Sequence, residues 1–142
     1  MAAVRIKQKK FGPVYVQYEG SDILLYGADL ASVDKVAPPT TSPVDTMLAS
    51  LGACIVKSIE WVAGQKKTPL NPFTVEVAGI KAADLPNRVE ALTVRVDIRA
   101  LDDPETAKAV IKQAKSICTV SNSLNCDVAL TVEPFDSAAD GV

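Results

Sequence analysis

One stretch of this chain, residues 42–64, constrains the fold more than any other. It begins with three signals that start a helix. Ser42 can serve as the N-cap, Pro43 suits the first helical position, and Asp45 completes a capping box. Gly64 is the residue type that commonly ends a helix. The sequence therefore predicts a helix of about six turns between these signals.

The predicted helix is apolar around most of its circumference, and Cys54 lies at its middle. Apolar residues recur at steps of three and four, at Leu48, Leu51, Ile55, Ile59 and Val62. Others widen the stripe, namely Ala49, Ala53, Val56 and Trp61. A helix of this kind needs cover on more than one side, and a single sheet covers only one side. We therefore expect a homodimer in which a second copy covers the remaining side.

The rest of the chain predicts strands and one more helix. Alternating apolar residues indicate strands over 4–8, 14–18, 23–26, 73–78, 92–99 and 126–132. A turn is expected at Gly12-Pro13. The second helix starts at Asp103-Pro104 and has an apolar stripe of Ala107, Val110, Ile111, Ala114 and Cys118. This order predicts a single α+β domain over residues 1–142 with a mainly antiparallel sheet.

Composition disfavours several classes of function. A net charge of −2 without a basic run disfavours nucleic-acid binding. We find neither an apolar stretch of about 18 residues nor a signal-peptide core, so we expect a cytoplasmic protein with no membrane contact. The chain has no histidine, which rules out Ser-His and Cys-His nucleophile pairs and His-ligated metal. We expect no metal and no cofactor.

The three cysteines, Cys54, Cys118 and Cys126, each have two interpretations from the residues alone. Buried free cysteines are common, so each can be a small core residue. Cys118 is followed by a hydroxyl-rich stretch that can donate hydrogen bonds, and Cys126 falls on the inward side of the last strand. There is no CxxC pair, which disfavours a thioredoxin-type site and the common zinc patterns. Spacing alone leaves open whether Cys54 and Cys118 meet.

Two motifs around these cysteines resemble a known family. The segment from Ser42 to Cys54, with Leu48-Ala49-Ser50-Leu51-Gly52-Ala53-Cys54, is similar to the first cysteine motif of the OsmC/Ohr family (osmotically inducible protein C and organic hydroperoxide resistance proteins). Cys118-Thr119-Val120-Ser121-Asn122 is similar to the family's Cys-Pro-x-Ser-Asn pattern. The separation of the two cysteines, 118 − 54 = 64 residues, and the order of strands and helices also fit.

The resemblance implies a fold and a chemistry. Family members are intertwined homodimers, with mainly antiparallel sheets wrapped around two long central helices, and they reduce organic hydroperoxides with cysteine. By this resemblance Cys54 is the peroxidatic cysteine and Cys118 the resolving one. The peroxide oxidises Cys54 to a sulfenic acid, Cys118 condenses with it to a disulfide, and a dithiol or lipoyl-type reductant restores both thiols.

The chain also departs from the family pattern. Members usually activate the first cysteine with an arginine from the N-terminal region, held by a glutamate. Here Asp45 stands in the carboxylate region, but it precedes Cys54 by nine residues and falls on the opposite helix face. It is either a capping residue or a site residue that acts through a neighbouring segment. The only N-terminal arginine is Arg5, which no local motif aligns, and Thr119 replaces the usual proline.

These departures resemble the divergent OsmC-like branches, and they leave two functions to compare. The first is a cysteine peroxidase acting on organic hydroperoxides in oxidative-stress defence. The alternative is a non-catalytic OsmC-like dimer that binds a small apolar ligand at its interface.

Overall fold

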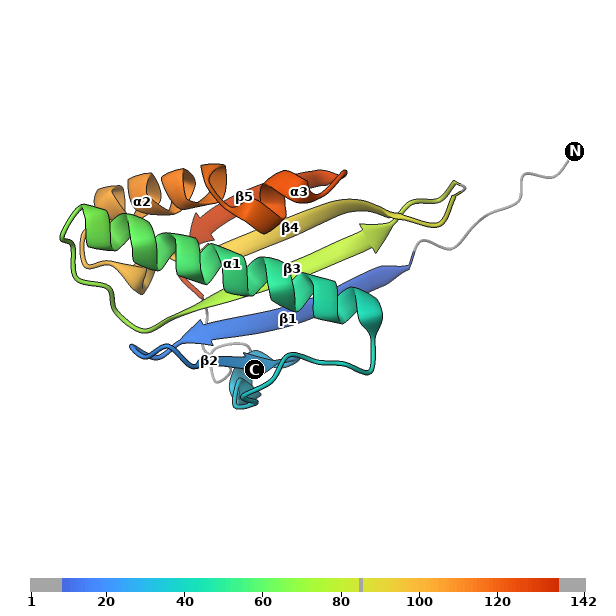
Figure 1. Cartoon of the computed structure of the whole chain (residues 1–142), viewed down its shortest axis with the longest axis horizontal. Helices are drawn as coiled ribbons and strands as arrows, with labels where there is room; N and C mark the ends of the chain where they lie inside the picture. Colours follow the sequence, from blue (N-terminus) through green and yellow to red (C-terminus); the bar gives the residue numbers. More distant parts are fainter. Residues whose placement is uncertain (1–8, 85, 136–142) are drawn as a thin grey trace, which may run out of the picture.

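Helix α1, Pro43–Gln65, runs the length of the computed structural model, which describes residues 9–84 and 86–135 (Figure 1). Its start is as predicted, because the Ser42 hydroxyl accepts the N–H of Asp45 at 3.3 Å. The predicted end at Gly64 is wrong. The helix continues to Gln65, and Lys67 takes the left-handed conformation, with φ of 52°, that ends it. The N–H of Lys67 donates to the Gly64 carbonyl at 3.1 Å.

Five strands form one mixed sheet in the order β2-β1-β3-β4-β5. The strands are β1 Lys10–Tyr18, β2 Leu24–Gly27, β3 Phe73–Lys81, β4 Val89–Asp97 and β5 Asp127–Glu133. All neighbouring pairs are antiparallel except β4 and β5, which are parallel. The remaining elements are the short 3₁₀ helices η1 (Leu30–Ser32) and η2 (Ile98–Ala100), and the helices α2 (Pro104–Ser116) and α3 (Thr119–Ser123). The α+β class and the mainly antiparallel sheet are confirmed.

The predicted turn at Gly12-Pro13 is wrong, because both residues lie inside β1. The pairing of β1 with β3 shifts register between Phe11 and Val14, so Gly12-Pro13 forms a bulge in a continuing strand. Gly12 has φ of 73°, and a Cβ there would lie 2.8 Å from the Val77 carbonyl oxygen. The position therefore requires glycine. The strand predicted over 4–8 lies outside the described residues.

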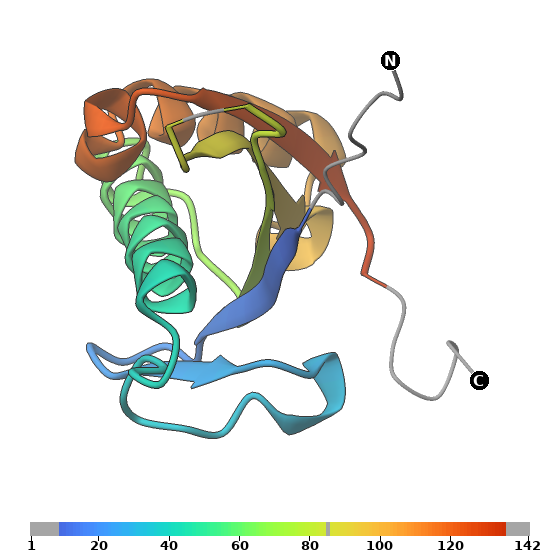
Figure 2. The same ribbon diagram turned by 90° about the vertical axis from the view of Figure 1, so that its right-hand side faces the viewer.

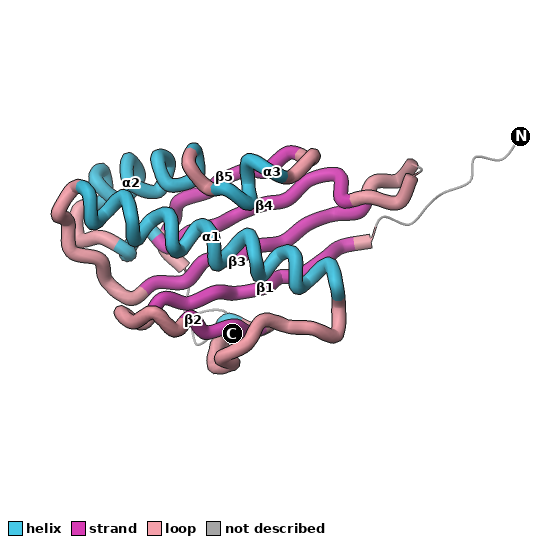
Figure 3. Tube along the Cα trace, in the orientation of Figure 1, coloured by secondary structure: helices cyan, strands magenta, loops and turns pink. Residues whose placement is uncertain are grey.

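Both long helices pack on the same face of the sheet, as Figures 1 and 3 show, and Figure 2 views this two-layer arrangement from the end. The core lies between the layers. Its strand residues alternate along β3 and β4, and its helix residues follow the predicted stripe of α1. The fully buried members include Val75, Val77, Val94, Val96, Leu48, Leu51, Ile55 and Ile59.

Close packing sets the height of α1 above the sheet. A Cβ added at Gly52 would lie 2.7 Å from Cγ2 of Val16, so only glycine allows this approach. Helix α1 has the length and composition of a membrane span. In this structure, however, its stripe of large apolar residues is buried against the sheet and α2.

Candidate functional site

Cys54 lies in the middle of α1, two residues after the close contact at Gly52. It is half-buried, unlike its neighbours Ile55 and Val56, which are fully buried. The helix therefore turns its large apolar residues toward the core and places the Cys54 thiol at the border of its outer side. This position gives the thiol more access to solvent than a core cysteine has.

Cys118 occupies a different position from the predicted one. We expected it at the end of the second helix, but α2 ends at Ser116 and Cys118 is the N-cap of α3. Its Sγ atom accepts the backbone N–H of Ser121 at 3.5 Å. The hydroxyl-rich segment Thr119–Ser123 is itself helical, and Cys118 is fully buried.

The fold brings Cys54 and Cys118 together, although 64 residues separate them. Both are free thiols, and Cys54 lies close enough to Cys118 to influence the pKa of its thiol. The pKa of the Cys118 thiol is raised to about 11, chiefly by burial and in smaller part by the neighbouring Cys54, while the hydrogen bond from Ser121 opposes the rise. Cys118 is therefore a protonated thiol at neutral pH, beside a more accessible Cys54.

Cys126 lies one residue before β5 and is half-buried. Burial raises the pKa of its thiol, the negative charge of Asp127 adds to this shift, and the positive charge of Arg88 opposes it. Its charged neighbours thus come from β5 and from the segment that enters β4, whereas the thiol pair is built by α1 and α3. Its interpretation as a structural cysteine stays a prediction.

Asp45 fastens the start of α1 to the sheet. Its N–H donates to the Ser42 hydroxyl, and its carboxylate accepts the N–H of Gly12 in β1 at 3.2 Å. Nine residues of helix put it about 13 Å along the axis from Cys54. The structure thus gives Asp45 a capping and tethering contact, and it does not bring Asp45 to the two thiols.

The three arginines in the described part of the chain all form ion pairs with carboxylates. Arg5 lies outside the described residues. Arg95 alternates with Val94 and Val96, which face α1, so its side chain lies on the opposite face of the sheet. The ion pairs are Arg88 with Asp84, Arg95 with Glu76 and Glu133, and Arg99 with Asp97.

Sequence reasoning missed an apolar cavity of about 330 Å³ at the N-terminal end of α1. Met47 lines this cavity and lies seven residues, two helical turns, before Cys54, so the two residues share a helix face. The lining combines apolar side chains with cations: Phe11, Val44, Met47, Val89, Asn87, Lys9, Lys81 and Arg88. The cavity joins β1, α1 and the β3–β4 connection, so no local pattern in the sequence indicates it.

Metal ligation has no candidate in the described part of the chain. No group of three or more cysteine, aspartate or glutamate side chains there is arranged to hold an ion.

Comparisons with known proteins identify the family and support the fold. The family of OsmC-like proteins matches residues 36–133. An organic hydroperoxide resistance protein OsmC from Legionella pneumophila is 18% identical, with a TM-score of 0.56 over 96% of this chain and 100% of that one.

Two further solved structures have the same fold. An organic hydroperoxide resistance protein from Elizabethkingia anophelis is 18% identical, with a TM-score of 0.55 over 94% of this chain and 99% of that one. An OsmC-like protein of unknown function from Vibrio cholerae is 16% identical, with a TM-score of 0.55 over 85% and 84%. No curated protein matches the chain.

Proposed function

The chain belongs to the OsmC-like protein family, and on this premise we propose that it is a cysteine peroxidase that reduces organic hydroperoxides to alcohols. The observation that carries the proposal is the contact between the free thiols of Cys54 and Cys118. The hydroperoxide resistance proteins among the similar structures are consistent with it.

Each step of the proposed reaction balances. The Cys54 thiolate attacks the outer oxygen of the hydroperoxide, the O–O bond breaks, and the alkoxide leaves as an alcohol after taking up a proton. Cys54 is now a sulfenic acid. The Cys118 thiol attacks its sulfur, water leaves, and a disulfide forms. A dithiol or lipoyl-type reductant then supplies two electrons and two protons and restores both thiols.

Burial supports the assignment of roles within the pair. A peroxide must reach the attacking sulfur, and Cys54 is the half-buried member. Cys118 is fully buried, and its pKa of about 11 keeps it protonated at neutral pH. A protonated, enclosed thiol is a poor first nucleophile, but it can condense with a sulfenic acid formed beside it.

The cavity near Met47 supports the proposed preference for organic peroxides. Its apolar side chains, Phe11, Val44, Met47 and Val89, can hold an alkyl or aryl group on the same helix face as Cys54. Hydrogen peroxide has no such group and cannot use this binding energy. The same cavity could serve the alternative function, a dimer that binds a small apolar ligand without catalysis.

A disulfide map after treatment with cumene hydroperoxide tests the proposal. One equivalent of the peroxide should convert Cys54 and Cys118 rapidly into a disulfide and leave Cys126 free, and hydrogen peroxide should act more slowly. Peptide mapping by mass spectrometry measures both rates. Thiols that stay reduced with cumene hydroperoxide would contradict catalysis, and a search of the cavity near Met47 for a bound apolar ligand would follow.

We also propose that the active form is a homodimer built on the outer side of α1. Met47, Cys54 and Trp61 repeat at seven-residue spacing along this side, and Trp61 is 56% exposed in the single chain. The exposed Trp61 lies on the same side of α1 as Cys54, and this side is a surface that a second α1 can cover. The partner chain would then also enclose the thiol site.

The single tryptophan of the chain makes this dimer measurable. Dilution should shift Trp61 emission to longer wavelength as sedimentation shows the mass falling from two chains to one. An Ala53→Glu variant, on the outer side of α1, should stay monomeric at concentrations where the wild type is a dimer. The matched control is Ala109→Glu, at an exposed position of α2, and it should behave as wild type. A wild-type monomer at micromolar concentration would refute the dimer.

A further inference from the structure

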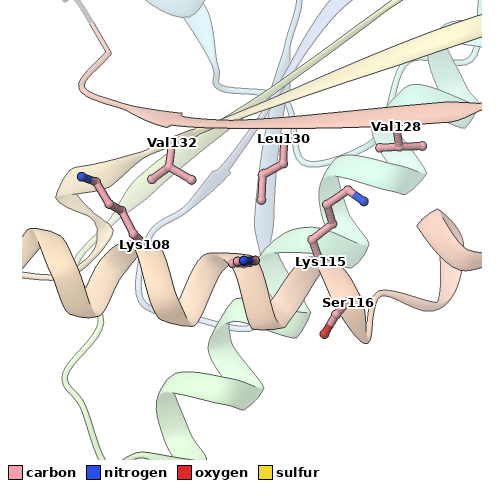
Figure 4. Close-up of a pocket in the computed structure, with 7 residues that line it drawn as sticks. Lys108, Lys115, Ser116, Val128, Leu130 and Val132 are labelled. Atoms are coloured by element: carbon pink, nitrogen blue, oxygen red, sulfur yellow. The ribbon is translucent and has the colours of Figure 1, made fainter.

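A groove of about 530 Å³ lies between helix α2 and the edge strand β5, and it falls within the size range of ligand pockets (Figure 4). One wall is the helix, with Lys108, Lys112, Lys115 and Ser116. The floor is the strand, with Val128, Leu130 and Val132. None of these residues belongs to the Cys54–Cys118 pair.

The floor of the groove is apolar surface that the fold leaves uncovered. On the neighbouring strand β4, the helix-facing residues Leu92, Val94 and Val96 are completely buried. The corresponding residues of β5 are Val128, Leu130 and Val132, and all three are only half-buried. Helix α2 thus does not close over the edge strand, and an apolar strip along β5 is open to a ligand.

The wall carries three positive charges on one helix face, because its lysines are spaced by four and three residues. Figure 4 shows Lys108 and Lys115 extending from α2 toward β5. The Nζ atom of Lys108 lies 3.6 Å from Oε1 of Glu105 on the same helix. This ion pair is exposed, so it contributes little to stability. Among the ion pairs of the described residues, none joins Lys112 or Lys115 to a carboxylate. Neighbouring like charges repel, and a bound anion would relieve this repulsion.

We propose that this groove binds a linear alkyl carboxylate of medium chain length. The ammonium groups of Lys112 and Lys115 hold the carboxylate, and the alkyl chain lies along Val128, Leu130 and Val132. The three side chains of the floor offer no hydrogen-bonding group, so they select a tail without polar atoms. The Ser116 hydroxyl already donates to the Gln113 carbonyl at 2.6 Å, which leaves the lysines as the polar contacts.

The shape of the groove favours a small ligand over an acidic protein. Its lysines border one cleft between a helix and a strand instead of spreading over an open surface. From Lys108 to Lys115 the helix rises roughly 10 Å, and β5 extends roughly 13 Å from Val128 to Val132. A single head group with an extended tail matches a cleft of this length.

An NMR titration of the full chain with sodium decanoate tests this site. Amide signals of residues 108–116 and 128–132 should shift and saturate. The Lys112→Ala/Lys115→Ala variant should bind about tenfold or more weakly, because it loses the charged hydrogen-bond donors. Alanine is well tolerated in a helix, so this variant should keep the fold. The control Lys35→Ala/Lys66→Ala removes the same charge elsewhere and should bind as wild type.

Four outcomes would overturn the proposal. Decanoate could fail to saturate, or it could shift signals on the outer side of α1 instead of α2 and β5. Decanol could bind as tightly as decanoate, which would exclude recognition of the carboxylate by the lysines. An acidic peptide could bind the groove where decanoate does not.

Discussion

Replacing Cys54 by serine is expected to lower the turnover of cumene hydroperoxide by about a thousandfold or more, because removal of a nucleophile abolishes the covalent route. A serine hydroxyl can occupy the same half-buried position but cannot form a sulfenic acid with a peroxide. The free energy of unfolding should change little, because serine is close to cysteine in size. Turnover is measured as alcohol produced in the presence of a dithiol, and stability as unfolding in urea.

The other two cysteines provide matched controls for this prediction. Cys118→Ser should keep the first oxidation step, so one equivalent of alcohol forms and the Cys54 sulfenic acid can be trapped with dimedone. Serine can also cap α3, as Cys118 does through its contact with Ser121. Cys126→Ser should turn over as wild type. If Cys54→Ser kept its activity while Cys126→Ser lost it, the roles proposed for the thiols would be refuted.

Local signals in the sequence predicted the helices better than the turns. The start of α1 at Ser42 and the start of α2 after Asp103 follow from side chains that cap the next turn, and both contacts are present. Gly12 could not be interpreted correctly from its neighbours. A glycine beside a proline is typical of a turn, and the bulge that keeps it in β1 depends on pairing with β3, more than 60 residues away.

The candidate site, too, could be predicted only in part from the sequence. The motifs around Cys54 and Cys118 could be found in the sequence, but no local rule brings two residues together across 64 positions. Their contact depends on how α3 packs beside α1. The cavity at Met47 has the same origin, because β1, α1 and the β3–β4 connection all contribute to it. The sequence therefore identified the candidate residues, but it could not predict which of them lie next to each other in the fold.

A large loss of folding stability is expected at high pH, and its source is Tyr15 on the sheet face opposite α1. Tyr15 is 8% exposed and its hydroxyl donates to Glu76 at 2.8 Å. The pKa of Tyr15 is raised to about 12 by burial, by the hydrogen bond to Glu76 and by the charge of Glu76, while Arg95 opposes the rise. The unfolded chain releases this proton near pH 10, so between pH 10 and about 12 it binds fewer protons than the folded chain. Stability therefore falls as pH rises through this window.

The size of this loss and its origin can both be measured. Raising the pKa from 10.0 to about 12 contributes about 2 to 3 kcal/mol to the free energy of unfolding. This contribution is fully present below pH 10 and is lost above about pH 12. Urea unfolding of Tyr15→Phe should show a shallower decline over this window, after a loss of about 1 kcal/mol at neutral pH for the missing hydrogen bond to Glu76. Both proteins, the one with Tyr15 and the Tyr15→Phe variant, should also carry Cys118→Ser. Without it, the raised pKa of Cys118 would add a second loss of stability between pH 9 and about 11. If the free energy of unfolding fell equally steeply with pH in the two proteins, burial and Glu76 would not hold this proton in the folded state.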